Sequence, residues 1–288
     1  MSLVTRHDVE APAHPVLVVA LEGWIDAGFA AATAASTILD QVKTEAYATF
    51  DADELVDQRS RRPRLRIDDG VRAGVTWSEP QLLVGADRLG AGVALLVGPE
   101  PDYRWRAFSA EVTALALEID ARLLVGLGGF PTATPHTRPV RLASTASSES
   151  LARSVGFIPG SIDVPAGIGD VVGLGCSTAG IPSVGLWARV PHYVAGMAFP
   201  PAALALVEGL AAISGLVLDV EDLRESAEAG RRRVDELIAQ SSEHLAMVHR
   251  LEVQLDEGDE LELPGDADLP SGDEIAAELE RYLRGEAQ

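Results

Sequence analysis

PVLVVALEGWIDAGFAAATAASTIL, residues 15–39, predicts a strand, a loop and a helix in immediate succession. Pro15 to Leu21 is a short apolar run rich in β-branched residues, which is typical of a buried strand. The alanine-rich run Phe29 to Leu39 predicts a helix, because alanine has the highest helix propensity. A strand followed by a helix opens an α/β unit.

The same alternation continues outward from this unit. Strands are predicted at Ala46–Phe50, Gln81–Val84, Val93–Val97, Leu123–Leu127 and Ser183–Val190, with an extended segment at Arg138–Thr145 and helices at Phe108–Ile119 and Pro200–Gly215. Strands that alternate with helices predict a three-layer α/β/α sandwich with a mostly parallel sheet. We expect this core domain to span residues 1–220.

Residues 221–288 differ from the core in composition and predict an acidic, helical C-terminal extension. They hold 20 acidic and 7 basic residues. Apolar residues recur at helical spacing from Leu223 to Leu255, which predicts one long amphipathic helix or two shorter ones. Asp256–Asp273 predicts a linker and Ile275–Leu283 a last short helix. The apolar stripe either forms the inner face of a solvated helix or packs on a neighbouring subunit or partner.

Charge and cysteine content limit the partners and the compartment. The net charge of −21 and the pI near 4.6 argue against binding to nucleic acid or an anionic membrane surface. Cys176 is the only cysteine, which excludes an internal disulfide and a cysteine-based metal cluster. The sequence shows no signal peptide and no apolar run of membrane-spanning length, so we expect a cytoplasmic protein.

The residues show no committed catalytic apparatus, which favours a protein that is not an enzyme. Lys43 is the only lysine, and it lies outside any P-loop or Schiff-base motif. HExxH, HxH and GxSxG spacings are absent. No catalytic residue, metal site or cofactor is therefore predicted.

A ligand crevice is nevertheless expected where loops follow the carboxyl ends of the strands. Its candidate residues are Glu22, Trp24, Asp26, Glu100, Asp102, Gly128, Gly129 and His192. Glu22 could act as an acid or a base and Trp24 as a stacking wall; alternatively Asp26 caps a helix and Trp24 packs in the core. Residues 126–135 predict a glycine-rich turn whose spacing differs from the dinucleotide-binding fingerprint.

Residues 51–63, DADELVDQRSRRP, combine four carboxylates with three arginines. Blocks of opposite charge predict a surface ion-pair network or an interface. Arg59, Arg61 and Arg62 are the candidate interface residues, and their guanidinium groups could also bind an anion.

Five ordered segments between residues 15 and 215 resemble the actinobacterial branch of the proteasome assembly chaperone 2 family. They are LEGWIDAG (21–28), DADELVDQRSRRP (51–63), LLVGPEPDYRWRAF (95–108), GLGGFPTATPHTRPV (126–140) and VPHYVAGMAFPPAALALVEGL (190–210). The resemblance implies a fold similar to nucleoside phosphorylases and hydrolases, and a homo-oligomer such as a trimer. Some relatives end in a hydrophobic–Tyr–any tripeptide that docks on the proteasome; this sequence ends in RYLRGEAQ (281–288) and lacks it.

Two functions follow from these observations. The resemblance implies a non-catalytic protein-binding or assembly protein that associates with itself and with proteasome subunits or another protein. The alternative is an enzyme or small-molecule binder of the nucleoside phosphorylase type, which would use the carboxylate-lined crevice.

Overall fold

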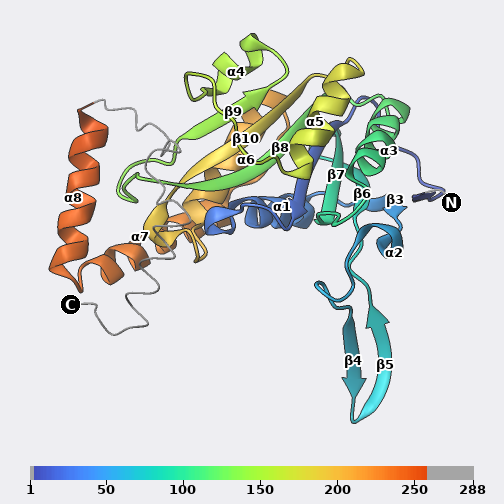
Figure 1. The fold of residues 1–288 in the computed structure, drawn as a ribbon, viewed down its shortest axis with the longest axis horizontal. Helices are drawn as coiled ribbons and strands as arrows, with labels where there is room; N and C mark the ends of the chain where they lie inside the picture. The colour runs from blue at the N-terminus through green and yellow to red at the C-terminus, as the bar shows by residue number, and fades with distance from the viewer. Residues whose placement is uncertain (1–2, 258–288) are drawn as a thin grey trace, which may run out of the picture.

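The computed structural model describes residues 3–257, and its centre is an eight-stranded sheet (Figure 1). The strand order is β1-β3-β6-β7-β2-β8-β10-β9. The strands of this sheet are β1 (Val4–Arg6), β2 (Val16–Glu22), β3 (Glu45–Phe50), β6 (Gln81–Ala86), β7 (Gly92–Pro99), β8 (Leu123–Thr132), β9 (Leu142–Ala146) and β10 (Ser183–Pro191).

The four central strands, β7, β2, β8 and β10, are parallel to one another. The outer pairs on both sides of them are antiparallel. The apolar run that begins at Val16 forms β2, which lies at the middle of the sheet with β7 and β8 as neighbours. A strand in this position is covered on both faces, which explains its almost continuous apolar sequence.

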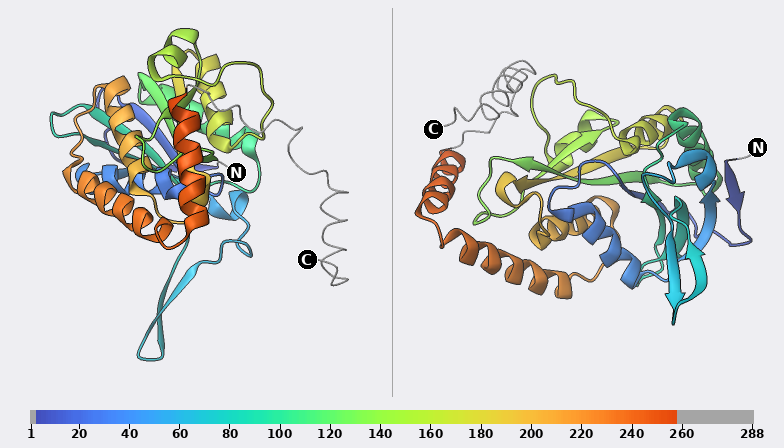
Figure 2. Two further views of the ribbon diagram at one scale, coloured as in Figure 1. Left: turned by 90° about the vertical axis from the view of Figure 1, so that its left-hand side faces the viewer. Right: turned by 60° about the horizontal axis from the view of Figure 1, so that its bottom comes forward.

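Helices cover both faces of the sheet, so the predicted α/β/α sandwich is confirmed (Figures 1 and 2). Helices α1 and α6 pack together on one face, and α3 and α5 pack together on the other. The helices are α1 (Ala30–Gln41), α2 (Ala52–Leu55), α3 (Trp105–Glu118), α4 (Glu149–Val155), α5 (Ile168–Thr178), α6 (Pro200–Ser214), α7 (Glu221–Ile238) and α8 (Ser242–Asp256), with short 3-10 turns η1 (Ala27–Phe29) and η2 (His192–Val194).

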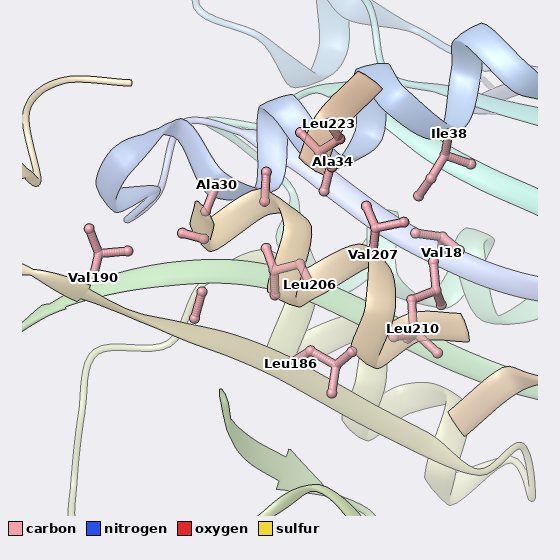
Figure 3. Close-up of a cluster of buried hydrophobic side chains, with 14 of the residues drawn as sticks. Val18, Ala30, Ala34, Ile38, Leu186, Val190, Leu206, Val207, Leu210 and Leu223 are labelled. Carbon is pink, nitrogen blue, oxygen red and sulfur yellow. The ribbon is translucent and has the colours of Figure 1, made fainter. Parts of the chain in front are cut away.

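The larger hydrophobic cluster lies between the sheet, α1 and α6 (Figure 3). Ala30, Ala34 and Ile38 form the inner face of α1, and Leu206 and Leu210 belong to the facing helix α6. All five side chains are fully buried. Small alanine side chains let the two helices approach each other closely over the sheet.

The C-terminal extension begins with two helices rather than one long helix. Leu223, Val234 and Ile238 of α7 are buried and join the hydrophobic cluster that α1 and α6 share. Helix α8 follows after a short turn (Figure 2). The division of the chain after residue 220 stays a prediction. The predicted segment Ile275–Leu283 and all but the first two residues of the predicted linker lie outside the described residues.

Elements β1, α2, α4 and α5 were not predicted from the sequence, and two further regions also differ from the predictions. The predicted glycine-rich turn at residues 126–135 is wrong in its first part, because β8 continues to Thr132 in parallel register with β10. Residues 64–76, for which no strand was predicted, form the hairpin of β4 (Arg64–Asp68) and β5 (Val71–Thr76), which projects from the body (Figure 1).

Candidate functional site

A pocket of about 300 Å³ lies on the α5 side of the sheet, over β2, β8 and β10. Gly126 of β8 and Gly185 of β10 are paired in register and both line it. Gly126 has no side chain, so the pocket is open above it, whereas the Thr145 hydroxyl and the Trp187 indole lie close over the backbone of Gly185. Val19, Leu124 and Leu174 provide apolar walls.

The Glu100 carboxylate is the most buried acidic group of the pocket, with 6% of the residue exposed. Its Oε1 accepts a hydrogen bond of 2.9 Å from the N–H of Ile168, the first residue of α5. A helix N-terminus favours a negative charge, so α5 holds this side chain in place. Within the described residues, Oε2 has no hydrogen-bond partner and the carboxylate has no ion pair.

Two tryptophans line the same pocket from opposite parts of the sequence. Trp24, which is 39% exposed, packs against Gly167 just before α5; a Cβ at Gly167 would lie 2.7 Å from its Cδ1. Trp187 of β10 packs over Gly128, where a Cβ would overlap the indole ring. Glycine at both positions therefore allows the aromatic rings to lie against the backbone.

Asp170 and Asp26 add two more carboxylates to the lining. Burial raises the pKa of Asp170, although a hydrogen bond from the Gly167 N–H lowers it in part. The two oxygens of Asp26 accept hydrogen bonds from the N–H groups of Ala31 (2.7 Å) and Ala32 (3.0 Å), so this side chain caps α1. None of the described residues that line the pocket is basic.

The other residues of the predicted crevice lie outside this pocket. Glu22 is exposed at the end of β2, where its carbonyl accepts a hydrogen bond of 2.6 Å from the Glu100 N–H. The carboxylate of Asp102 is occupied by the Asp57 N–H at 2.7 Å and by Arg61 Nη1 at 3.0 Å. Of the eight predicted residues, only Trp24, Asp26 and Glu100 line one cavity.

Gly128, Gly129 and His192 have other surroundings. The two glycines lie within β8, and a Cβ at Gly129 would lie 2.8 Å from the carbonyl oxygen of Ala27. His192 begins η2 after β10, where it is exposed and its Nδ1 lies 3.4 Å from the carbonyl oxygen of Thr132. None of the three lines the pocket, although Gly128 lies directly under the Trp187 ring that does.

The three predicted interface arginines lie between α2 and the β4–β5 hairpin. Arg61 pairs with Asp102 and donates to the Glu100 carbonyl, so it ties this segment to the end of β7. Arg59 and Arg62 are exposed, and no ion pair engages either one among residues 3–257. They remain available to a partner.

A second polar cluster connects the β8–β9 loop to α7. His136 is 2% exposed, with Nδ1 at 2.7 Å from the Tyr193 hydroxyl and Nε2 at 3.0 Å from Asp235. The Tyr193 oxygen accepts the His136 backbone N–H. Burial is the main reason that the pKa of Tyr193 rises to about 12, so its hydroxyl stays protonated and can donate to Nδ1.

Sequence reasoning missed Trp187, Asp170 and the paired glycines of the pocket. Alternation along β10 was the available signal, because Gly185 and Trp187 are two residues apart and face the same side of the sheet. Helix α5 was missed since its sequence, IGDVVGLGCST, contains three glycines and has a low helix propensity.

Residues 3–257 contain no group of three His, Cys, Asp or Glu side chains placed to hold a metal ion. In the same part of the chain, no helix combines the length and the apolar character needed to cross a membrane.

A model of the PAC2 family matches residues 20–238. The chain belongs to the PAC2 family. No curated protein matches it. Solved structures of PAC2-type proteins do match. It is 37% identical to a PAC2 family protein from Streptomyces avermitilis, over 81% of this chain and 99% of that one, with a TM-score of 0.72.

Two Mycobacterium tuberculosis crystal structures are also similar to this PAC2 chain. A proteasome-assembly chaperone homologue is 34% identical, over 81% of this chain and 99% of that one, with a TM-score of 0.75. A protein of unknown function is 34% identical, over 89% and 91% of the two chains, with a TM-score of 0.81. These sources confirm the resemblance to the actinobacterial branch of the family.

Proposed function

We propose that this PAC2 chain is a non-catalytic assembly-type protein that binds proteasome subunits. The observation that carries the proposal is the 34% identity to a proteasome-assembly chaperone homologue along 99% of that protein. We further propose that the chain acts in the cytoplasm as a homo-oligomer.

The chemistry of the described side chains supports a role without turnover. Cys176 of α5 is buried with its Sγ 3.8 Å from Thr113 Oγ1 of α3, and burial raises the pKa of its thiol, so it is not an activated nucleophile. The carboxylate of Asp26 caps helix α1, and the carboxylate of Asp102 forms an ion pair with Arg61. A carboxylate that is fully engaged in structural hydrogen bonds cannot transfer protons without disrupting them.

Proteasome binding can be tested with the full chain and purified actinobacterial proteasome α and β subunits. We expect the chain to co-elute with unassembled subunits in size-exclusion chromatography, to speed their assembly, and to be absent from the finished particle. Bovine serum albumin at the same concentration is the control for nonspecific crowding. If the chain neither forms a complex with either subunit nor changes the assembly rate, the proposed partner is wrong.

The β4–β5 hairpin supports the proposed self-association. All its strand residues are exposed, including Ile67 (58%) and Val71 (68%). Leu65 and Val75 are direct cross-strand partners, so their side chains share one face. An isolated two-stranded hairpin is marginally stable in water, and this one exposes apolar side chains that a partner could bury.

The charge of the hairpin segment favours a second copy of this chain as that partner. Residues 59–76 hold six arginines and two aspartates, whereas the whole chain has a net charge of −21. A basic projection on an acidic protein is complementary to the acidic surfaces of another copy. We propose that the hairpin of each subunit docks on an acidic surface of a neighbouring subunit. We expect the oligomer to contain three copies of the chain.

A single substitution on the hairpin tests this interface. Ile67→Asp should shift the molar mass, measured by light scattering, from three chains to one, because it places a carboxylate in the apolar contact. Leu89→Asp is the matched control, since Leu89 is 79% exposed on a different turn and should leave the mass unchanged. A wild-type chain that is already monomeric would rule out the interface.

A further inference from the structure

The pocket above Gly126 and Gly185 contains an acidic group whose charge the protein only partly compensates. Glu100 is more than nine-tenths buried, and a single hydrogen bond from Ile168 N–H engages its Oε1. Its Oε2 has no hydrogen-bond partner among the described residues, while Glu100 lines the open cavity. A carboxylate removed from water is costly unless a cation or several donors compensate it.

One arginine of the protein lies close to Glu100 but does not pair with its carboxylate. Arg61 approaches Glu100 from the Gly23 side, and its Nη1 is engaged by the Glu100 carbonyl and by Asp102. The described residues place no ion pair on the Glu100 carboxylate. Arg61 Nη2 and Glu100 Oε2 both lie beside Gly23, yet Arg61 forms no ion pair with this carboxylate and is not part of the pocket lining.

The other residues that line the pocket limit the charge and the chemical class of the ligand that it can bind. Carboxylates of Asp26, Glu100 and Asp170 line the pocket, and no basic side chain balances them. Phosphorylated and carboxylated ligands would therefore be repelled. Trp24 and Trp187 provide indole rings, whose faces attract organic cations and apolar groups alike.

We propose that this pocket binds a small organic cation that carries an apolar body. The charged nitrogen would donate to the Glu100 carboxylate beside the start of α5, and the apolar body would lie on the aliphatic and indole walls over Gly126. The volume of about 300 Å³ is at the lower end of the range for ligand pockets, which fits a compact ligand. Burial of Asp170 raises its pKa, so a cation would also stabilise the ionised form of that group.

Three ligands of similar shape test the charge requirement on the full chain: 2-phenylethylammonium, neutral 2-phenylethanol and anionic 3-phenylpropanoate. Isothermal titration calorimetry should show that the ammonium binds about tenfold more tightly than the alcohol, as expected for one charge-assisted hydrogen bond. The carboxylate should not bind. Equal affinity for all three, or no binding of the ammonium, would overturn the proposal.

Two substitutions locate the site. Glu100→Gln keeps an oxygen for the Ile168 N–H and should weaken ammonium binding about tenfold while leaving the alcohol unchanged. Glu22→Gln is the matched control, because Glu22 is exposed and outside the pocket while its carbonyl bonds to the Glu100 N–H. If both variants bind the ammonium like the wild type, the carboxylate has been assigned wrongly.

A space-filling variant separates binding in this pocket from binding elsewhere. A Cβ at Gly126 would meet only Gly185 Cα at 3.6 Å, so Gly126→Val should fold and fill the floor of the pocket. It should abolish binding of both the ammonium and the alcohol, and retained binding in a folded variant would place the site elsewhere. These measurements need no partner protein, so their outcome is independent of the proposed binding to proteasome subunits.

Discussion

Asp26 shows how one side chain can serve both local structure and the site. It was predicted either as a crevice residue or as a helix cap. In the structure it lines the pocket, and both its carboxylate oxygens accept hydrogen bonds from N–H groups of α1. Asp26→Ala should lower the free energy of unfolding by about 1 kcal/mol, the usual effect of losing such a cap. Urea denaturation would measure it, with exposed Glu22→Ala as the control; an equal effect in the two variants would contradict the capping role.

A second acidic residue should give the stability of the chain a defined pH dependence. Asp87 lies in the β6–β7 turn, and its oxygens accept N–H groups of Leu89, Ala91 and Val217. Burial raises the pKa of Asp87, but these backbone hydrogen bonds together outweigh it, so the pKa lies below its usual value.

The stabilisation by Asp87 should therefore be present above about pH 4, near the pKa of an unfolded aspartate, and disappear as the pH falls through the lower pKa of the folded state. Urea denaturation of the wild type and Asp87→Asn from neutral to acid pH would test this. The difference in unfolding free energy should stay constant at neutral pH and shrink in acid. A difference that grows in acid would mean that the direction of the pKa shift is wrong.

At the level of elements, α7 joins the acidic extension to the core. Leu223 is 6% exposed and packs in the cluster of α1 and α6, whereas Leu237 on the same helix is 45% exposed. Leu223→Ala should lower the free energy of unfolding by about 2–3 kcal/mol, because it leaves a cavity. Leu237→Ala should have little effect. If Leu223→Ala unfolds α7 separately while the sheet stays intact, the predicted division after residue 220 would be supported.

The elements that were predicted correctly and those that were missed differ in the interactions that form them. Strand β2 and helix α1 were predicted because a buried strand and an alanine-rich helix depend on local composition. Strand β8 was cut short, because Gly128 and Gly129 indicate a turn unless the parallel pairing with β10 is known. The β4–β5 hairpin was missed, although Asp69-Gly70 is a strong turn signal, because no strand was assigned to residues 64–76.

At the scale of the whole molecule, the sequence located the strand ends but could not establish which of them share a cavity. Parallel register brings Gly126 beside Gly185, and α5 brings Gly167 against Trp24. Both contacts join segments that are distant in sequence. Glu22 and Asp102 follow adjacent strands, yet one faces solvent and the other pairs with Arg61. The order of the strands therefore predicted where the site lies, but it did not predict which residues at the strand ends line the pocket.

The four tryptophans of the chain lie in three different parts of the molecule. Trp24 and Trp187 line the pocket, Trp77 is 51% exposed just after the hairpin, and Trp105 begins α3 with its Nε1 on the Pro101 carbonyl. Intrinsic fluorescence of single-tryptophan variants can thus follow occupancy of the cavity, contact at the hairpin and loss of the folded core as three separate optical signals. The native chain carries these probes without an added dye.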